Sequence, residues 1–394
     1  MNYDYKDWIE KYGKCVEVVN RLCEHDVSKY NVNKCFSAMA VMNFSMQDVD
    51  SYFKNNNQTP AELCFLIRNI DVIITSILDL NHDLLGVGLS RQDKAIEKCF
   101  NRPEIIHSFR TLRSLLLAHP VDTNYTNNEG QRETVYLEDI LPASPMDELM
   151  KLGEHDYTLR MCHPDAELSH FKPLKIDTDI IPVINEIVKG IKLLTGKLQK
   201  IISEYEEKLQ NEPLIIDNSD MKKYIMTLDN ELKKRYPSCV TDTEYTDGSV
   251  KHYSIVYDCL KYIKASFFSK TQEKYDIFLD YIMSELKRIE KDLQAMAYDS
   301  SEESYFSLCY NPDFAKNESY AKEKMAYLDE SDATSFTEED ILNTTPSNAL
   351  WGVQQFKKLI PYIEQYIPVD TTVSDRELYC EYIAAEYLSN IERD

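Results

Sequence analysis

The feature that most constrains this chain is a stretch with helical periodicity at residues 183–210, VINEIVKGIKLLTGKLQKIISEYEEKLQ. Its apolar side chains recur at alternating intervals of three and four residues, at Ile184, Ile187, Ile191, Leu194, Leu198, Ile201 and Tyr205. This spacing predicts a helix with one apolar stripe that continues for about three heptads. A stripe of that length needs a long partner helix. The partner is either the helix expected at 271–297 of the same chain or the same stripe of a second copy, in a dimeric coiled coil.

Start and stop signals predict further helices in the N-terminal part of the chain. The residues Thr-Pro-Ala-Glu at 59–62 form a capping box with a proline at the first helical position. A nearly continuous apolar run at 64–80 follows directly, and Asn81, His82 and Asp83, then Gly86 and Gly88, break it. Two more helix starts are predicted, by the capping pattern Ser90-x-x-Asp93 and by Pro103. These signals predict a helical bundle over residues 1–125.

The middle of the chain, residues 126–181, is predicted to be a loop-rich connector. Prolines interrupt any helical period here and at its borders, at positions 120, 142, 145, 164, 173 and 182. Two short segments, YTLRMC at 157–162 and LSHFKPLKI at 168–176, are candidates for a β-hairpin.

A second helical region, residues 182–394, is predicted to contain long antiparallel helices. Within it, the segment 299–340 has twelve acidic and three basic residues, a net charge of −9, which is typical of a solvated surface segment or linker. Pro361 should kink or split the helix expected at 348–367. The capping box Ser374-x-x-Glu377 should open a final helix. The fold class predicted for the whole chain is therefore mainly α.

Composition excludes several classes of protein. The chain has 44 Lys and Arg against 67 Asp and Glu, a net charge of −23, which repels nucleic acid unless a local basic region exists. No window approaches about 18 uncharged apolar residues, and the first residues are acidic and aromatic, so we expect a cytoplasmic protein without a membrane segment. The ten cysteines form no CxxC pair, which favours reduced, structural thiols.

Common catalytic and metal-binding motifs are missing from the sequence. It contains no GxxxxGK[ST], GxGxxG, HExxH or GxSxG motif, so hydrolysis of nucleotides by a P-loop is not expected. Cys162, His163 and His170 are metal-ligand types, but their spacing matches no zinc site, and polar loop residues are the simpler interpretation. We therefore predict no metal and no cofactor.

One region differs from the acidic average, and we call residues 91–119 the basic island. It has six Lys or Arg and three Asp or Glu, a net charge of +3. On a helix that advances about 100° per residue, one side should be apolar and the other polar. The predicted apolar side consists of Ile105, Phe109, Leu112 and Leu116. The predicted polar side consists of His107, Arg110, Thr111 and Ser114.

Arg113 and His119 fall on either side of this apolar stripe, about 120° apart, where a buried face meets solvent or a partner. Pro120 disfavours the α conformation at His119, so this imidazole should lie at the last turn or just beyond it. A helix C-terminus favours a protonated ring, which suits an acid or base.

The segment from Arg113 to His119, RSLLLAH, resembles the R-x4-6-H motif of the HEPN superfamily, helical domains that are common in prokaryotic toxins and antiviral effectors. The resemblance covers mainly residues 60–125. Many family members carry Asn or Asp directly after the arginine, where this chain has Ser114. The resemblance implies a metal-independent endoribonuclease that works in a cleft between two such helices of a homodimer.

The roles that this resemblance implies follow the chemistry of RNA cleavage. The 2′-hydroxyl is the nucleophile, so the enzyme must remove its proton, protonate the leaving 5′ oxygen and stabilise charge on phosphorus. His119 would be the acid or base, and Arg113 would hold the phosphate. Arg110 and His107 would position the strand, and Ser114 would bond the phosphate or orient His119.

A structural interpretation of the same residues stays open. Arg113 would then pair with an acidic residue or neutralise the helix C-terminus, and His119 would cap a free carbonyl. The protein would be a non-catalytic helical interaction protein that binds a protein partner through its C-terminal half.

Overall fold

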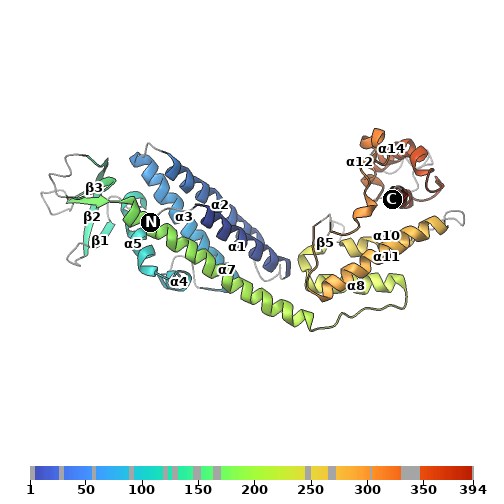
Figure 1. Cartoon of the computed structure of the whole chain (residues 1–394), viewed down its shortest axis with the longest axis horizontal. Coiled ribbons are helices and arrows are strands. Elements are labelled where there is room, and N and C mark those ends of the chain that lie inside the picture. Colours follow the sequence, from blue (N-terminus) through green and yellow to red (C-terminus); the bar gives the residue numbers. More distant parts are fainter. Residues whose placement is uncertain are drawn as a thin grey trace. The chain divides into compact units, whose positions relative to one another are not determined.

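The chain folds into two units, Met1–Tyr205 and Glu206–Asp394, called here the first unit and the second unit. The computed structural model describes residues 5–25, 31–55, 59–87, 93–118, 123–126, 132–144, 152–162, 170–244, 250–264, 272–301, 304–329 and 347–392. This described part is mainly α-helical with small antiparallel sheets, as predicted (Figure 1). The division between the units falls inside a helix and not at residue 182, so the connector 126–181 belongs to the first unit.

The first unit is built on helices that share one apolar core. They are α1 (Tyr5–His25), α2 (Val32–Lys54), α3 (Pro60–Leu85), α4 (Asp93–Cys99), α5 (Pro103–Arg113) and most of α7 (Ile181–Gln210). The predicted capping box at Thr59 is present, and Gly86 ends α3 in the left-handed conformation with φ 65°. Ser90 lies outside the described residues. The helical bundle that the start signals predicted is therefore confirmed, and Figure 1 shows α1, α2, α3 and α7 side by side.

The predicted hairpin exists and belongs to a larger sheet. The strands β1 (Thr123–Thr126), β2 (Arg132–Pro142), β3 (Tyr157–Cys162) and β4 (His170–Leu174) pair in this order, all antiparallel. The two strands β1 and β2 were not predicted. In β2, a register shift between Leu137 and Asp139 breaks the alternation of side chains between the two faces of the sheet. A buried contact between the hydroxyls of Tyr52 and Tyr157, at 3.0 Å, joins the sheet to α2.

The long apolar stripe of α7 packs inside the first unit. Ile184, Ile187, Ile191, Leu194 and Leu198 are buried in the same core as α1, α2 and α3, followed by Ile202. Tyr205 contacts α1, with its ring centroid 5.4 Å from that of His25. Packing within the chain was one of the two open interpretations, but the proposed partner at 271–297 was wrong. The stripe is buried by its own unit, which leaves no seam for a dimeric coiled coil.

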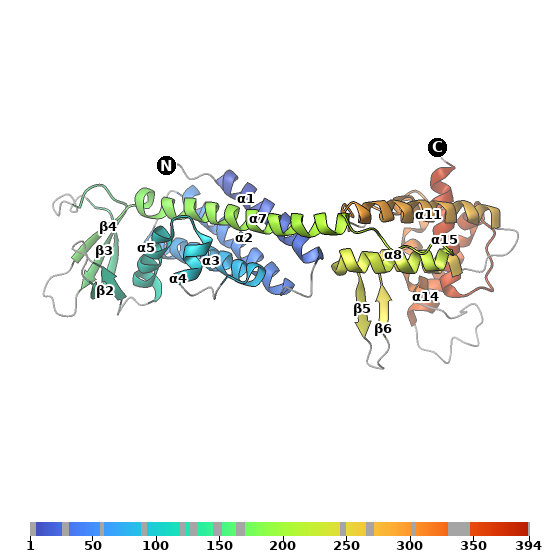
Figure 2. The same ribbon diagram turned by 90° about the horizontal axis from the view of Figure 1, so that it is seen from below.

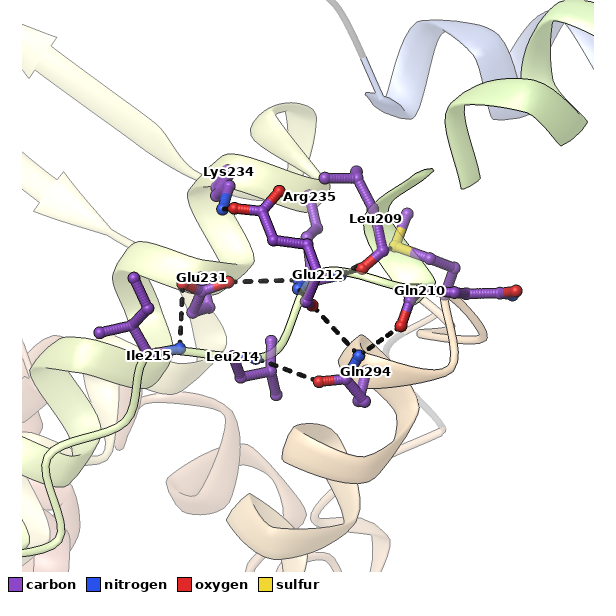
Figure 3. Close-up of polar contacts among 10 residues, drawn as sticks. Leu209, Gln210, Glu212, Leu214, Ile215, Glu231, Lys234, Arg235 and Gln294 are labelled. Carbon is purple, nitrogen blue, oxygen red and sulfur yellow. Dashed lines mark hydrogen bonds and ion pairs between the residues drawn. The ribbon is translucent and has the colours of Figure 1, made fainter. Parts of the chain in front are cut away.

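The second unit begins with the last turn of α7. Its next elements are α8 (Met221–Arg235), η3 (Pro237–Cys239), the hairpin of β5 (Thr241–Glu244) and β6 (Val250–Tyr253), α9 (Ile255–Asp258), α10 (Leu260–Lys264) and α11 (Gln272–Gln294). Figure 3 shows how Arg235 and Gln294 hold the chain where α7 ends. Arg235 donates from Nη1 to the Leu209 carbonyl at 2.7 Å and from Nη2 to the Glu212 carbonyl at 2.8 Å. The first bond satisfies a carbonyl in the last turn of α7, which a helix end leaves without an intrahelical partner, and the second holds the segment that follows the helix.

The rest of the second unit is a set of short and medium helices. They are η4 (Ser307–Cys309), η5 (Lys316–Glu318), α12 (Ser319–Glu323), α13 (Ala326–Asp329), α14 (Ser347–Ile363) and α15 (Asp375–Ile391). The Ser374 capping box of α15 is present, and α14 ends two residues after Pro361. The described part of 299–340 is not a solvated linker, because Tyr305, Phe314 and Met325 are buried. Charge alone misled the prediction, since the few apolar residues of this segment are enough to anchor it.

The ten cysteines have free thiols, and six of them are buried. Burial raises the pKa of the Cys35 and Cys99 thiols to about 11, so both stay protonated and pack as small apolar groups. Among the described helices, none is both long and apolar enough to cross a membrane.

Candidate functional site

The start of α5 is fixed by buried contacts with α7. The backbone N–H of Arg102 donates to the Glu186 carboxylate at 2.8 Å, and Glu186 is fully buried. Gly190 lies so close to Phe100 that a Cβ atom at this position would be 2.7 Å from the aromatic ring. Pro103 then occupies the first turn of α5, where its missing N–H has no cost. The helix that carries the predicted site therefore begins at a rigid point.

The two predicted sides of α5 are confirmed. Phe109, Leu112 and Leu116 are buried, together with Ile106 and Leu115, while Ile105 is half-buried. The polar side chains of His107, Arg110 and Ser114 are half-buried, so they lie at the edge of the core and not fully in solvent. The Thr111 hydroxyl donates to the His107 carbonyl oxygen at 3.1 Å. Figure 2 shows α5 next to the sheet and to α3, which both contact it.

Arg113 is held in place by an acidic residue of a neighbouring helix. Its Nε lies 2.9 Å from Oδ2 of Asp71 on α3, and the arginine side chain is 37% exposed while that of Asp71 is 15% exposed. A guanidinium has five N–H donors in a planar fork, so an ion pair at Nε leaves donors for a second anion. The contact orients Arg113 at the margin of the core, where the sequence analysis placed it.

The chain leaves α5 through a short π-helix, η1 (Ser114–Ala118). This changes the predicted geometry, because the value of about 100° per residue holds for an α-helix and not for a π-helix with i→i+5 bonds. The predicted angle between Arg113 and His119 therefore does not apply. His119 itself lies outside the described residues, so the structure does not show how far its ring is from Arg113. Single π-helical turns occur often at functional sites.

The charges of the basic island are partly neutralised by neighbours. Arg102 pairs with Glu104 at 2.9 Å, and both side chains are exposed. Lys197 of α7 approaches the end of α4, where its Nζ donates to the Lys98 carbonyl oxygen at 2.9 Å. This lysine extends the basic region beyond residues 91–119, and sequence reasoning did not find it because it lies in another helix.

Of the cysteine and histidine group in the sheet, only the side chain of Cys162 lies within the described residues. The Cys162 thiol donates to Oε2 of Glu138 at 3.0 Å. His163 and the side chain of His170 lie outside the described residues. Among the described residues, no group of three His, Cys, Asp or Glu has the arrangement of a metal site.

The second unit contains polar clusters that sequence reasoning missed. His252 lies between two carboxylates, with Nδ1 2.6 Å from Oδ1 of Asp242 and Nε2 2.7 Å from Oδ2 of Asp229. The other carboxylate oxygen of Asp229, Oδ1, accepts from the Ser254 hydroxyl. A groove of about 690 Å³ lies near the residues of Figure 3 and is lined by Pro213, Leu214, Lys287, Glu290, Lys291, Gln294 and Ala295. No local motif identifies the His252 cluster, because α8, β5 and β6 bring its residues together only in the folded chain.

Comparison with known protein families, curated proteins and solved structures finds no match for this chain.

Proposed function

We propose that the end of α5 is the RNA-binding and catalytic site of a metal-independent endoribonuclease of the HEPN type. The observation that carries the proposal is the placement of Arg113. Its guanidinium is half-exposed, anchored by Asp71 and followed by a π-helical turn that leads directly to His119. Cleavage by attack of the 2′-hydroxyl requires a group that transfers a proton and a cation that stabilises the charge on phosphorus, and Arg113 is held in a position where it could be that cation.

The proposed reaction assigns each residue a separate task. His119 transfers the proton, and Arg113 stabilises the additional negative charge on phosphorus. A single copy supplies one histidine, so a second copy would supply the other member of the acid and base pair. Arg110, His107 and Ser114 line the same edge of the helix and would position the strand. The basic island attracts RNA to this region in spite of the net charge of −23.

The test is cleavage of generic RNA by the full chain in the presence of EDTA. Arg113→Ala and His119→Ala should each lower the rate by about 100-fold or more, with a nearly unchanged melting temperature. Products should end in a 2′,3′-cyclic phosphate, because the 2′-hydroxyl is the nucleophile. Arg110→Ala should mainly weaken binding and reduce its salt dependence.

Arg160 provides a matched control in the same unit. Its Nε pairs with Glu138 at 3.0 Å and its side chain is 41% exposed, which resembles the state of Arg113, but it lies on β3 outside the basic island. Arg160→Ala should leave the rate unchanged. Cleavage by His119→Ala at the wild-type rate would contradict the proposal.

A second candidate function is a non-catalytic helical interaction protein. The observation that favours it is again the ion pair between Arg113 and Asp71, because pairing with an acidic residue is the structural role expected for this arginine. Under this interpretation, Arg113→Ala would lower the free energy of unfolding by up to about 1 kcal/mol, and RNA would not be cleaved.

A further inference from the structure

Three aromatic side chains meet on the surface of the second unit, and we call Tyr320, Tyr327 and Trp351 the aromatic cluster. They come from α12, α13 and α14, and both α12 and α13 pack against α14. The rings of Tyr320 and Trp351 are 6.5 Å apart at an interplanar angle of 76°. Figure 1 shows α12 and α14 next to each other.

The close approach of α13 to α14 depends on a glycine. A Cβ atom at Gly352 would lie 3.0 Å from the Leu328 side chain and 3.3 Å from Cβ of Tyr327. The backbone of α14 can therefore approach Tyr327 directly next to Trp351. The cluster is thus positioned by helix packing and not by a flexible loop.

Two members of the aromatic cluster are exposed, and Tyr327 is half-buried. Tyr320 is 52% exposed and Trp351 is 40% exposed, whereas Trp8, the other tryptophan of the chain, is completely buried. Exposed aromatic groups of this size are enriched at sites where proteins bind partners. Isolated exposed rings need no explanation, but rings from three helices that meet at one place do.

A lysine already occupies the faces of these rings. Nζ of Lys324 lies 5.0 Å from the ring centroid of Tyr320 and 5.6 Å from that of Tyr327. Lys324 forms no ion pair with any of the described residues. Its contacts with the two rings are therefore its main interactions. Aromatic faces carry negative partial charge and attract a cation within about 6 Å. The geometry is therefore already suitable for an ammonium or guanidinium group.

The charge of the surrounding unit favours the same kind of ligand. Residues 206–394 contain 21 Lys and Arg against 37 Asp and Glu, a net charge of −16. This field attracts a basic segment and repels a phosphate backbone. A nucleic acid that stacks its bases on the rings would have to overcome this repulsion.

We propose that the aromatic cluster binds a Lys or Arg side chain presented by a basic segment of a protein partner, and that Lys324 occupies the site when the partner is absent. The incoming cation replaces Lys324 over Tyr320 and Tyr327. Lys324 can leave at low cost because its flexible stem reaches solvent and no described carboxylate holds it. Trp351 forms the wall beside Tyr320 and packs against the stem of the incoming side chain. This site is independent of the ribonuclease proposal.

The test uses a hexalysine peptide as the probe and the full chain, with binding measured by calorimetry and by the emission of Trp351. Trp8 is buried in the first unit and provides a constant background. Tyr320→Ala and Trp351→Ala should each weaken binding about 3- to 30-fold, whereas Tyr320→Phe should bind as the wild type does, because the ring and not the hydroxyl attracts the cation.

Three further variants separate binding at the cluster from general electrostatic attraction. Lys324→Met removes the competing cation and should tighten binding about 3-fold or more. Lys316→Met removes the same charge at an exposed residue that pairs with Asp313, and it should have a smaller effect. Tyr310→Ala removes a ring that is 67% exposed but outside the cluster, and it should not change binding.

Equal binding by the wild type, Tyr320→Ala and Trp351→Ala would overturn the proposal, since attraction by net charge would then be sufficient. Equal effects of Lys324→Met and Lys316→Met would also overturn it. Oligouridylate is the comparison probe for nucleic acid, the other class of partner. If it bound more tightly than hexalysine and lost affinity in Tyr320→Ala, the cluster would be a site for nucleic acid and the proposed partner would be wrong.

Discussion

Two arginines, Arg113 and Arg235, are each the last residue of a helix, and their surroundings differ completely. Arg113 ends α5 with one ion pair, to Asp71, and its side chain is 37% exposed. Arg235 ends α8 and is completely buried. It bonds the Leu209 and Glu212 carbonyls and pairs with Glu231 at 3.2 Å (Figure 3).

The difference between the two ends separates a structural cation from one that can still bind a ligand. A buried guanidinium is tolerated only when its donors are satisfied, and Arg235 meets this condition through carbonyls and a carboxylate. Arg113 is anchored at one nitrogen and stays partly in solvent, so an incoming phosphate does not have to displace its anchor.

Arg235→Met should lower the free energy of unfolding of the second unit by about 3 to 5 kcal/mol, because it removes the buried cation that pairs with Glu231 and one donor from each of the Leu209 and Glu212 carbonyls. Arg113→Met should lower the free energy of unfolding of the first unit by at most about 1 kcal/mol. Urea unfolding followed by circular dichroism measures both, with each transition fitted separately. Similar losses for the two variants would remove the distinction.

Gly190→Ala tests whether the start of α5 is as rigid as its contacts indicate. The added methyl group would meet the buried Phe100 ring, so we expect a loss of about 1 to 3 kcal/mol in the free energy of unfolding. Gly196→Ala on the same helix is the matched control, because a Cβ atom there meets nothing within 4 Å, and it should stabilise by up to about 1 kcal/mol. Thermal melting of the two variants should shift in opposite directions.

His252 tests whether a titratable contact of α8 makes the stability of the second unit depend on pH. Burial lowers the pKa of this imidazole, but its hydrogen bonds to Asp242 and Asp229 outweigh burial and raise the pKa above its usual 6.5. A raised pKa stabilises the folded state below about pH 6.5, and this contribution is lost as the pH rises through the folded value. His252→Gln should therefore cost about 1 kcal/mol at pH 6 and less at pH 9, measured by urea unfolding at both values. A cost that does not change with pH would contradict a protonated ring between the two carboxylates.

Asp71→Asn has the smallest expected effect and refines the role of Arg113. If Asp71 only orients the arginine, the variant should keep the RNA cleavage rate within about 10-fold of the wild type and lose less than about 1 kcal/mol of stability. Arg113→Ala should lose much more activity at the same cost in stability. Equal losses of activity in the two variants would show that the ion pair acts as one unit in catalysis.

Local signals in the sequence predicted several of the long helices but not their partners. The capping boxes at Thr59 and Ser374 are confirmed because the hydrogen bonds of a capping box join residues only three positions apart. The β1–β2 pair was missed because a register shift in β2 obscures its period. For the candidate site, the buried and polar sides of α5 were predictable, whereas the Asp71 partner of Arg113 comes from a separate helix, about forty positions earlier, that no spacing rule reaches.

The sequence by itself determined the mainly helical class, the ends of several helices and the apolar sides of α5 and α7, because these depend on neighbours within about one turn. Only the tertiary structure decided that the stripe of α7 is buried by α1, α2 and α3, and which of the two arginines is fully enclosed. Burial is decided by residues far apart in the chain, and so is the ion pair of Arg113 with Asp71. The sequence Lys-Lys-Arg at the end of α8 indicates a basic helix end, but only packing selects Arg235 for the interior.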